Sequence, residues 1–595
     1  MVGQVRGQRG YGDSPRFPGS FLDYDADTNA LTRGVLGYMV DASSRLSKHA
    51  LSYDRLGRAT DHTFGSDDAG NMHRMRWQYS YDDSNAGRLT AIASSNDDGL
   101  SSGETTYAYD DHGRVTHLGL RNGAHTTYAY DRGGRLTRLA NAHTSGYLGV
   151  SFDYEYDANS NITRIAQDFN GVDVAHEYAY DELNRLTREK TCDYDDSYSY
   201  DDVGNRTALT RVAGGVTKAT AYSHNAAHEL TQLVYSEGAA AQYTKTYGYD
   251  AAGRTTRVTK QGSGLTTVIH TYDWDAADRL TRAQVDTGGN VKTVGYGYNA
   301  AGLRVRRVDT STNVTKLYSY QGDNLASIQE SSGGSYGAKD WTYTVAPGMI
   351  SNALERHQVA SSGGSTTSQY YQYDHRGNVV AVTDSSGDIQ YGYQYDAFGN
   401  IMFSFDEGAA AAPTDDILFT GKDLDADTGL YYFNARWYDL EVGRFVSRSV
   451  LASATEHPYA FCGQNPVGFA DPDGLARTRA LSPEQQRALE HMLEACFFSQ
   501  PQRKLDALDL AGCCCALRDL MHSVFEGGFL FRFFASVGGQ PSAADCAKGC
   551  TLLTPEVMTG REVAASFFAC MKKVHKTLAT ALGIPVTPGD YDPRY

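Results

Sequence analysis

One short pattern of aromatic, acidic and glycine residues recurs along most of the chain. In its clearest copies, Tyr-x-Tyr-Asp is followed within two or three residues by Gly or Asn, then by Arg, an apolar residue and Thr. Two neighbouring copies run from Tyr107 to Thr116 and from Tyr128 to Thr137. From Asp110 to Asp201, successive copies lie 20 to 26 residues apart, which is room for two strands and two turns, so the pattern predicts a repeated β-hairpin. Further copies are centred on Asp157, Asp181, Asp201, Asp250, Asp275, Asp374 and Asp396, and weaker ones on Asp54, Asp82, Asn225 and Asn299.

The residues of one copy suit a tight hairpin turn. Tyr178 and Tyr180 are two positions apart, so on a strand their rings share a face. The following Asp can accept hydrogen bonds within its own turn, and Gly or Asn tolerates a positive φ there. A single hairpin is marginal in water, so the copies are expected to join into one continuous antiparallel sheet. Tyrosine-rich strands also allow a sugar-stacking surface, but packing is the favoured role of most rings.

Composition and charge support this interpretation and narrow the function. The chain has 61 Gly and 42 Tyr against 14 Pro and 4 Trp, which favours strands and turns. Residues 1–476 hold 41 Lys/Arg and 59 Asp/Glu, and residues 477–595 hold 13 and 12. An acidic body disfavours binding of nucleic acid or of anionic membranes by the repeats. No run of about 18 apolar residues predicts a transmembrane helix, and residues 1–15 lack the apolar core of a secretory signal peptide.

The pattern ends at Leu475, and helical signals follow it. Ser482, Pro483 and Gln485 form a helix start, and residues 505–525 and the stretch after Thr554 predict two more helices. Seven of the nine cysteines lie after residue 476, so at least one cannot pair within this segment. Small buried or disulfide-bonded cysteines are favoured. The alternatives are a zinc site of Cys546 and Cys550 with His522 or His575, a Cys/His nucleophilic pair, and acid–base chemistry by Asp519 and His522.

The repeat resembles the YD repeat of Rhs and WapA-type bacterial proteins, of the C component of Tc toxins and of teneurins. The resemblance covers about residues 21–475. It implies a mainly β fold, a spiralling antiparallel shell of YD hairpins, complete or partial, with a small mainly α C-terminal domain. The end of the array resembles the Rhs repeat-associated core at residues 419–423, 428–439, 443–447 and 465–466 and at Asp471–Leu475.

The resemblance also implies a domain order and a cleavage site. An irregular leader is expected over residues 1–20, YD repeats over 21–400, the core as a plug over 401–475, and a variable effector over 476–595. Relatives cut themselves after the DPxGL motif, which corresponds here to Leu475. This aspartic-protease-like step needs two carboxyl groups that share a proton.

Asp471 is the first carboxyl candidate, and Arg436 occupies the supporting arginine position. The second acid is replaced by Ser449, so cleavage is expected to be slow or absent unless Asp439 or Asp473 substitutes. Without catalysis, Asp471 and Pro472 would simply form the turn that ends the plug.

An area estimate bears on whether the array can enclose a cargo. A folded segment of about 120 residues needs a wall of roughly 6,400 Å², and about 455 repeat residues supply roughly 4,900 Å² of strand surface. We therefore expect an open, partial shell, or a longer array whose N-terminal repeats precede this chain.

Three functions remain open at this point. The resemblance favours a toxin in interbacterial competition, secreted or at the cell surface, with an immunity protein and a delivery or secretion-system partner. The alternatives are a cell-surface carbohydrate-binding or adhesion protein that contacts glycans through its repeats, and an inactive orphan copy. No cofactor and no resident metal is expected.

Overall fold

The computed structural model describes most of residues 21–479 and, beyond them, only two short strands. The gaps are residues 25–30, 40–45, 55–57, 68–73, 83–86, 97–102, 146–148, 322, 333–334, 346–352, 360–366, 407–416, 450–456 and 476–477. The chain divides into two compact units, residues 1–484 and 485–595. The predicted leader, the C-terminal helices and the candidate cysteine and histidine sites lie outside the described residues. In the second unit, β39 (Lys504–Leu505) pairs with β40 (Met558–Thr559).

The first unit is dominated by one antiparallel sheet, here called the wall. Each of its 32 described strands pairs with the next one along the chain, so the wall is a continuous meander. Its last strand covers residues 401–406, which are the first residues of the range 401–475 expected for the plug.

The strands are β1 (Phe21–Tyr24), β2 (Leu31–Met39), β3 (Leu46–Tyr53), β4 (Ala59–Asp67), β5 (Arg74–Tyr81), β6 (Leu89–Asn96), β7 (Glu104–Tyr109), β8 (Val115–Gly119), β9 (Ala124–Tyr130), β10 (Leu136–His143), β11 (Gly149–Tyr156), β12 (Ile162–Phe169), β13 (Val172–Tyr180), β14 (Leu186–Lys190), β15 (Tyr194–Tyr200), β16 (Arg206–Ala213), β17 (Val216–His224), β18 (Leu230–Glu237), β19 (Ala240–Tyr249), β20 (Thr255–Gln261), β21 (Val268–Trp274), β22 (Leu280–Thr287), β23 (Asn290–Tyr298), β24 (Arg304–Asp309), β25 (Val314–Gln321), β26 (Asn324–Ser332), β27 (Ser335–Val345), β28 (Ala353–Val359), β29 (Thr367–Tyr373), β30 (Val379–Thr383), β31 (Ile389–Tyr395) and β32 (Ile401–Asp406).

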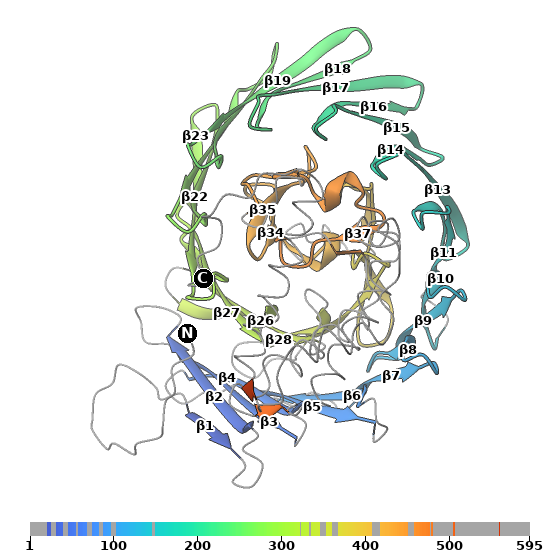
Figure 1. Cartoon of the computed structure of the whole chain (residues 1–595). Helices are drawn as coiled ribbons and strands as arrows, with labels where there is room; N and C mark the ends of the chain where they lie inside the picture. Colours follow the sequence, from blue (N-terminus) through green and yellow to red (C-terminus); the bar gives the residue numbers. More distant parts are fainter. Residues whose placement is uncertain are drawn as a thin grey trace. The chain divides into compact units, whose positions relative to one another are not determined.

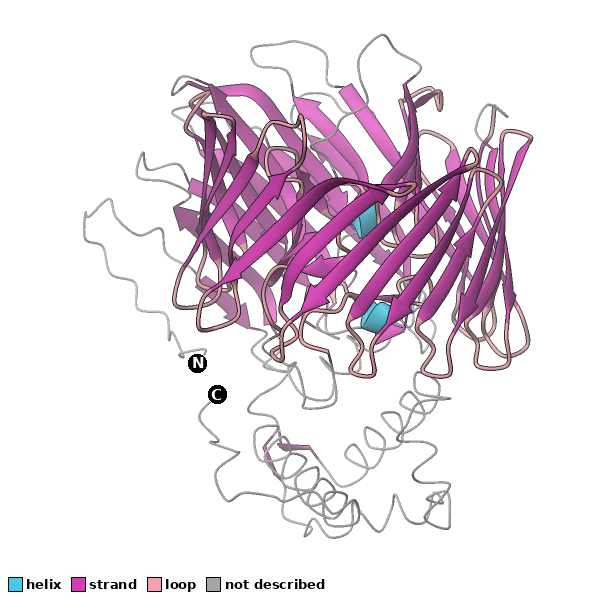
Figure 2. Cartoon of the chain, turned by 90° about the horizontal axis from the view of Figure 1, so that it is seen from above, coloured by secondary structure: helices cyan, strands magenta, loops and turns pink. Residues whose placement is uncertain are grey.

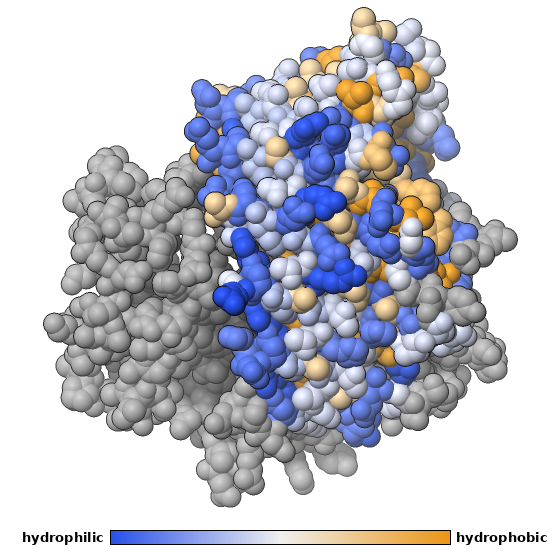
Figure 3. Space-filling model, turned by 90° about the vertical axis from the view of Figure 1, so that its right-hand side faces the viewer, coloured by the Kyte–Doolittle hydropathy of each residue, from blue (hydrophilic) through white to orange (hydrophobic). Residues whose placement is uncertain are grey.

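The turn of each repeat is built as the sequence predicts. In the clearest copy, Asp110 Oδ1 accepts the backbone N–H of Arg114 at 2.9 Å, and its Oδ2 accepts the Arg114 Nε–H at 2.7 Å. Gly113 has a φ of 82°, which a glycine adopts without strain. Each of these turns follows an odd-numbered strand of the meander, so all of them lie along the same one of the two rims that carry loops in Figure 2. The strands alternate between exposed and buried positions, as in β7, and the coloured part of the side seen in Figure 3 is largely hydrophilic.

The second tyrosine of each copy joins one repeat to the preceding one. The hydroxyl of Tyr109 donates to the carbonyl of Leu89, 20 residues earlier, at 2.6 Å. The guanidinium of Arg88 from the preceding turn lies 5.0 Å from the centre of the Tyr109 ring. Similar bonds of 2.5 to 3.0 Å join Tyr81, Tyr130, Tyr156, Tyr180, Tyr200, Tyr249, Tyr298, Tyr320, Tyr373 and Tyr395 to earlier carbonyls. The motif therefore links hairpins as well as closing turns.

One repeat offers a matched test of this link. The Tyr249 hydroxyl donates to the Leu230 carbonyl at 3.0 Å, whereas the Tyr247 hydroxyl has no hydrogen-bond partner among the described residues. We expect Tyr249→Phe to make local opening of β18–β20 easier by about 1 kcal/mol, and Tyr247→Phe to change it little. Amide hydrogen exchange of these strands measures the difference. Equal effects from both substitutions would show that the hydroxyl contributes nothing to the link.

The wall winds past a full turn, so its last strands lie inside its first ones (Figure 1). Trp77 on β5 donates its indole N–H to Thr344 on β27 at 3.0 Å. Ser94 on β6 donates to Glu355 on β28 at 2.7 Å. These contacts put about 22 strands in one turn, which at about 4.8 Å per strand gives a backbone radius of about 17 Å. The predicted spiralling β-hairpin fold is confirmed.

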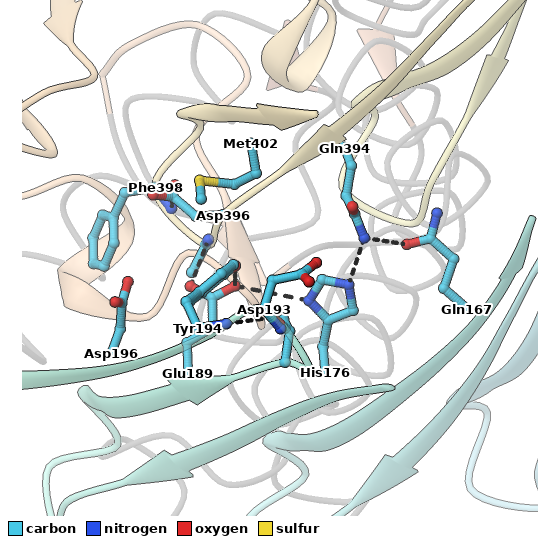
Figure 4. Close-up of polar contacts among 12 residues, drawn as sticks. Gln167, His176, Glu189, Asp193, Tyr194, Asp196, Gln394, Asp396, Phe398 and Met402 are labelled. Atoms are coloured by element: carbon cyan, nitrogen blue, oxygen red, sulfur yellow. Dashed lines mark hydrogen bonds and ion pairs between the residues drawn. The ribbon is translucent and has the colours of Figure 1, made fainter. Parts of the chain in front are cut away.

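Charged side chains as well as apolar ones join the two turns. Glu189 on β14 and Asp196 on β15 are fully buried, and Asp396 follows inner strand β31 (Figure 4). Arg211 bridges the two aspartates, at 2.6 Å from Asp196 and 3.2 Å from Asp396. Burial, which Arg211 only partly offsets, raises the pKa of Asp196 to about 6. Glu189 accepts the backbone N–H of Ala397 at 2.9 Å.

Candidate functional site

A compact segment follows the last wall strand and lies inside the wall (Figure 1). We call it the plug, and it comprises the described residues of 417–475. Its core is a cluster of aromatic rings, such as Tyr438 and Phe461, whose ring centres are 4.6 Å apart. Its elements are η1 (Phe419–Gly421), β33 (Asp423–Asp425), β34 (Leu430–Phe433), β35 (Arg436–Asp439), β36 (Arg444–Phe445), η2 (Cys462–Gln464) and β37 (Phe469–Ala470), which pairs with β38 (Thr478–Arg479).

An ionic cluster ties β33 of the plug to the wall. Asp425 is fully buried and accepts hydrogen bonds from Arg307 Nε at 2.9 Å, Arg307 Nη2 at 3.2 Å and the Tyr296 hydroxyl at 2.7 Å. Burial raises the pKa of Asp425, but the charge and hydrogen bonds of Arg307 outweigh this and hold the pKa below its usual value. Arg307 also contacts Asp427, and Arg304 pairs with Asp423.

The plug brings together the two residues that the sequence singled out for cleavage. Asp471 is 1% exposed, and its Oδ2 accepts a hydrogen bond from Arg436 Nη2 at 3.0 Å across 35 positions of sequence. Arg436 also donates Nε–H to the Gly474 carbonyl, and its guanidinium lies 3.5 Å from the centre of the Phe445 ring. We call the residues from Asp471 to Leu475 the junction. Arg436 thus binds the junction at two points, the Asp471 carboxylate and the Gly474 carbonyl.

Ser449 lies directly against the predicted cleavage point. Its hydroxyl donates to the Leu475 carbonyl at 3.1 Å, and its backbone N–H donates to the Pro458 carbonyl at 2.9 Å. Asp473, one of the two substitute acids, accepts the Leu475 N–H on Oδ1 at 3.0 Å. The other, Asp439, accepts the N–H of Glu441, and no contact between it and the junction occurs among the described residues.

The sequence did not point to Lys422, although it lies within the Phe-Thr-Gly-Lys-Asp stretch of the core. Lys422 is 2% exposed and donates to the Pro472 carbonyl. Burial lowers its pKa to about 8, against the opposing charges of Asp471 and Asp473. Gly474 belongs to the matched DPxGL motif, but the motif alone assigned no role to it. It has a φ of 76°, and a Cβ there would lie 2.3 Å from the Phe433 carbonyl oxygen, so only glycine fits.

The burial of Asp471 predicts a pH-dependent contribution to the stability of the plug. Burial raises its pKa to about 6, although Arg436 lowers it. A carboxyl with a raised pKa stabilises the fold fully below its unfolded pKa near 4, and this contribution is lost as the pH rises through 6.

Because the wild type loses this contribution as the pH rises and the asparagine variant does not, Asp471→Asn should become more stable relative to the wild type by about 2 kcal/mol between pH 4 and pH 7.5. Thermal unfolding of both chains across this pH range measures the gain. The exposed Asp111→Asn is the control, and a pH-independent difference would contradict the prediction.

Metal sites and membrane-spanning helices were sought only among the described residues. No group of three or more His, Cys, Asp or Glu side chains there is arranged to hold a metal ion. None of the helices among them is long and apolar enough to cross a membrane.

Comparison with known proteins identifies the repeat. The RHS Repeat family model matches residues 109–145 and 373–402. The "tRNA3(Ser)-specific nuclease WapA" of Bacillus spizizenii is 30% identical over 304 residues, which are 50% of this chain and 12% of that protein. The "Double-stranded DNA deaminase toxin A" of Burkholderia cenocepacia is 31% identical over 207 residues, 32% of this chain and 14% of that one. The chain thus spans about an eighth of the length of these relatives.

A solved structure is similar at a lower level. The "Crystal Structure of TcdB2-TccC3-Cdc42" aligns at a TM-score of 0.40 and 17% identity, covering 80% of this chain and 26% of that one.

The wall, its hairpin links and the plug that lies inside it define a spiral β-shell protein. With the repeat matches, they place the chain in a family. It is an Rhs/YD-repeat protein, related to WapA and to toxins that carry the same repeats.

Proposed function

We propose that the wall and plug carry residues 476–595 as a toxin that acts in competition between bacteria. The observation that carries this proposal is the junction. Arg436, Lys422 and Ser449 each hold a backbone carbonyl of the last plug residues, so the following segment starts from a fixed point. That segment differs from the wall in composition and charge. Two relatives with this repeat are a tRNA nuclease and a DNA deaminase toxin by name, which supports a toxic cargo.

The proposed partners follow from the same function. A toxin made inside a bacterium requires a small immunity protein in the producing cell, and a secreted carrier requires a delivery partner. We propose a secreted or cell-surface location on this basis.

Expression of three forms of the chain in bacteria tests the proposal. The forms are the full chain, the chain ending at Leu475, and residues 476–595. We expect residues 476–595 to arrest growth, the chain ending at Leu475 to be harmless, and a small protein encoded beside this gene to restore growth. Harmless expression of both toxin-bearing forms, together with glycan binding by the chain ending at Leu475, would favour the adhesion function instead.

We further propose that this copy releases its cargo slowly or not at all. A serine hydroxyl cannot hold the second charge state of a proton-sharing carboxyl pair, and Ser449 stands where that second acid is expected. Asp473 is the one substitute acid that contacts the junction. The full chain should therefore migrate as one intact polypeptide after purification.

A further inference from the structure

Three histidines meet an arginine where the plug contacts the turn between β17 and β18. His224 and His228 come from the wall, and Arg444 and His457 come from the plug; we call these four residues the seam. The ring centres of His228 and His457 are 5.1 Å apart, and Arg444 Nη2 donates to the His228 carbonyl at 2.7 Å. The seam thus concentrates titratable rings around a permanent positive charge.

The hydrogen bonds of His457 require a neutral ring. Its Nδ1 accepts the backbone N–H of Tyr459 at 3.2 Å, so Nδ1 carries no proton. Its Nε2 lies 2.7 Å from Asn205 Oδ1, which is an acceptor, so Nε2 carries the hydrogen. A second proton on Nδ1 would face the N–H of Tyr459 and break that bond.

The other two rings have no compensating partner for a charge. Nδ1 of His224 and Nδ1 of His228 are buried without a hydrogen-bond partner among the described residues. Burial and the charge of Arg444 lower the pKa of His224 to about 4 and that of His457 to about 3.

The charged groups that face the seam do not reverse this effect. Arg206 and Arg448 add positive charge, Asp201 and Glu229 oppose it, and Tyr249 and Tyr459 face Arg444 as neutral phenols. Asp201 is engaged by Asn205 and Glu229 by Asn225.

Pro458 connects the seam to the junction. Pro458 lies between His457 and Tyr459, and its carbonyl accepts hydrogen bonds from Ser449 N at 2.9 Å and from Arg436 Nη1 at 3.5 Å. Movement of His457 therefore displaces an acceptor shared by two residues that hold the junction.

We propose that the seam is an acid-operated clasp, which holds the plug to the wall when His224 and His457 are neutral and opens when they are protonated. The clasp would regulate the proposed function by loosening the plug, and with it the junction, in mildly acidic surroundings. Its chemistry does not depend on whether residues 476–595 are toxic.

The direction and size of the pH effect follow from linkage. A histidine whose pKa is lowered in the closed state binds its proton only after opening, so closure weakens as the pH falls below about 6.5. At pH 5, one such histidine shifts the equilibrium constant for opening roughly 30-fold toward the open state, and His224 and His457 together shift it by up to about 10³-fold. Asp471 acts in the opposite sense at the junction, so the test must report on the seam itself.

The two cysteines of the described residues provide that report in the intact chain. Cys462 is buried five positions after His457, and Cys192 is exposed on the wall. Both cysteines are labelled with 4,4′-dithiodipyridine, and peptide mass spectrometry gives the labelling rate of Cys462 divided by that of Cys192. Because Cys192 is exposed, dividing by its rate largely removes the pH dependence of the thiol–reagent reaction itself. We expect this ratio to rise at least 30-fold from pH 7.5 to pH 5.0 in the wild-type chain.

Variants separate the clasp from general acid sensitivity. The triple variant His224→Phe/His228→Gln/His457→Gln should keep the ratio nearly constant, whereas His62→Gln should behave as the wild type. His62 is a fully buried histidine that stacks on Trp77 of the wall, and burial lowers its pKa to about 4. A wild-type ratio that does not change with pH would overturn the proposal, and so would an equal rise in the triple variant.

A measurement on the wild type covers the case in which the triple variant does not fold. The Phe445 N–H donates to the Tyr459 carbonyl at the seam, and the Val446 N–H donates to the Trp437 carbonyl inside the plug, both at 3.0 Å. At pH 5.0 we expect hydrogen exchange to lose protection at Phe445 at least tenfold more than at Val446. Equal protection at both positions would overturn the clasp, whereas growth arrest by residues 476–595 tests the proposed toxin separately.

Discussion

Replacing Ser449 by aspartate is expected to make the chain cut itself after Leu475. The Ser449 hydroxyl already donates to the Leu475 carbonyl at 3.1 Å, so a carboxyl at this position lies beside the bond to be cleaved. Asp471 is buried in the same junction with a pKa raised to about 6, which suits the protonated member of an acid–base pair. We expect a rate increase on the order of 10²–10⁴-fold, seen as fragments 1–475 and 476–595 on gels and by mass spectrometry.

Two variants distinguish catalysis from accidental proteolysis. Ser449→Asn has nearly the size of the aspartate but no ionisable group, so it should stay intact. Ser449→Asp/Asp471→Asn lacks one carboxyl of the pair and should stay intact as well. If the single aspartate variant is folded and remains uncut from pH 4 to pH 8, the proposed proton-sharing geometry is wrong.

The local structure of the wall was predictable from sequence because it depends on neighbouring residues. Asp110 and Gly113 form their turn within five positions, and the period of 20 to 26 residues sets which strands pair. The meeting of Arg436, Ser449 and Asp471 at the junction was also predictable, because all three belong to the core motif in one segment of the chain.

The contacts between turns of the spiral were not accessible in this way. Trp77 meets Thr344 across 267 positions, and Ser94 meets Glu355 across 261. Which strands come face to face depends on how many strands make one turn, and that number follows from sheet curvature, which no single repeat encodes. The inter-repeat bond of the second tyrosine was missed for a related reason. The packing of the rings follows from the repeat itself, but the carbonyls that accept their hydroxyls belong to the preceding repeat, 14 to 22 residues earlier.

Replacing Arg307 by methionine is expected to destabilise the plug by about 3–5 kcal/mol. The change leaves the Asp425 carboxylate buried with the Tyr296 hydroxyl but without its bidentate partner. Denaturant unfolding, followed by tryptophan fluorescence, to which Trp437 in the plug contributes, measures the loss. Arg138→Met is the matched control. Arg138 also pairs with an aspartate, Asp153, but both side chains are about half exposed, so its loss should cost no more than about 1 kcal/mol.

A double variant shows whether the cost arises from the unpaired charge. Arg307→Met/Asp425→Leu removes both charges, so it should be more stable than Arg307→Met alone by at least about 2 kcal/mol, even though Tyr296 loses a hydrogen bond worth about 1 kcal/mol. Such non-additivity would show that the ion pair is energetically coupled across the contact between wall and plug. Additive losses would mean that each side chain acts through packing alone. The plug would then be held to the wall chiefly by its aromatic core. The Arg307–Asp425 ion pair would contribute little free energy against the opening of the seam at acidic pH.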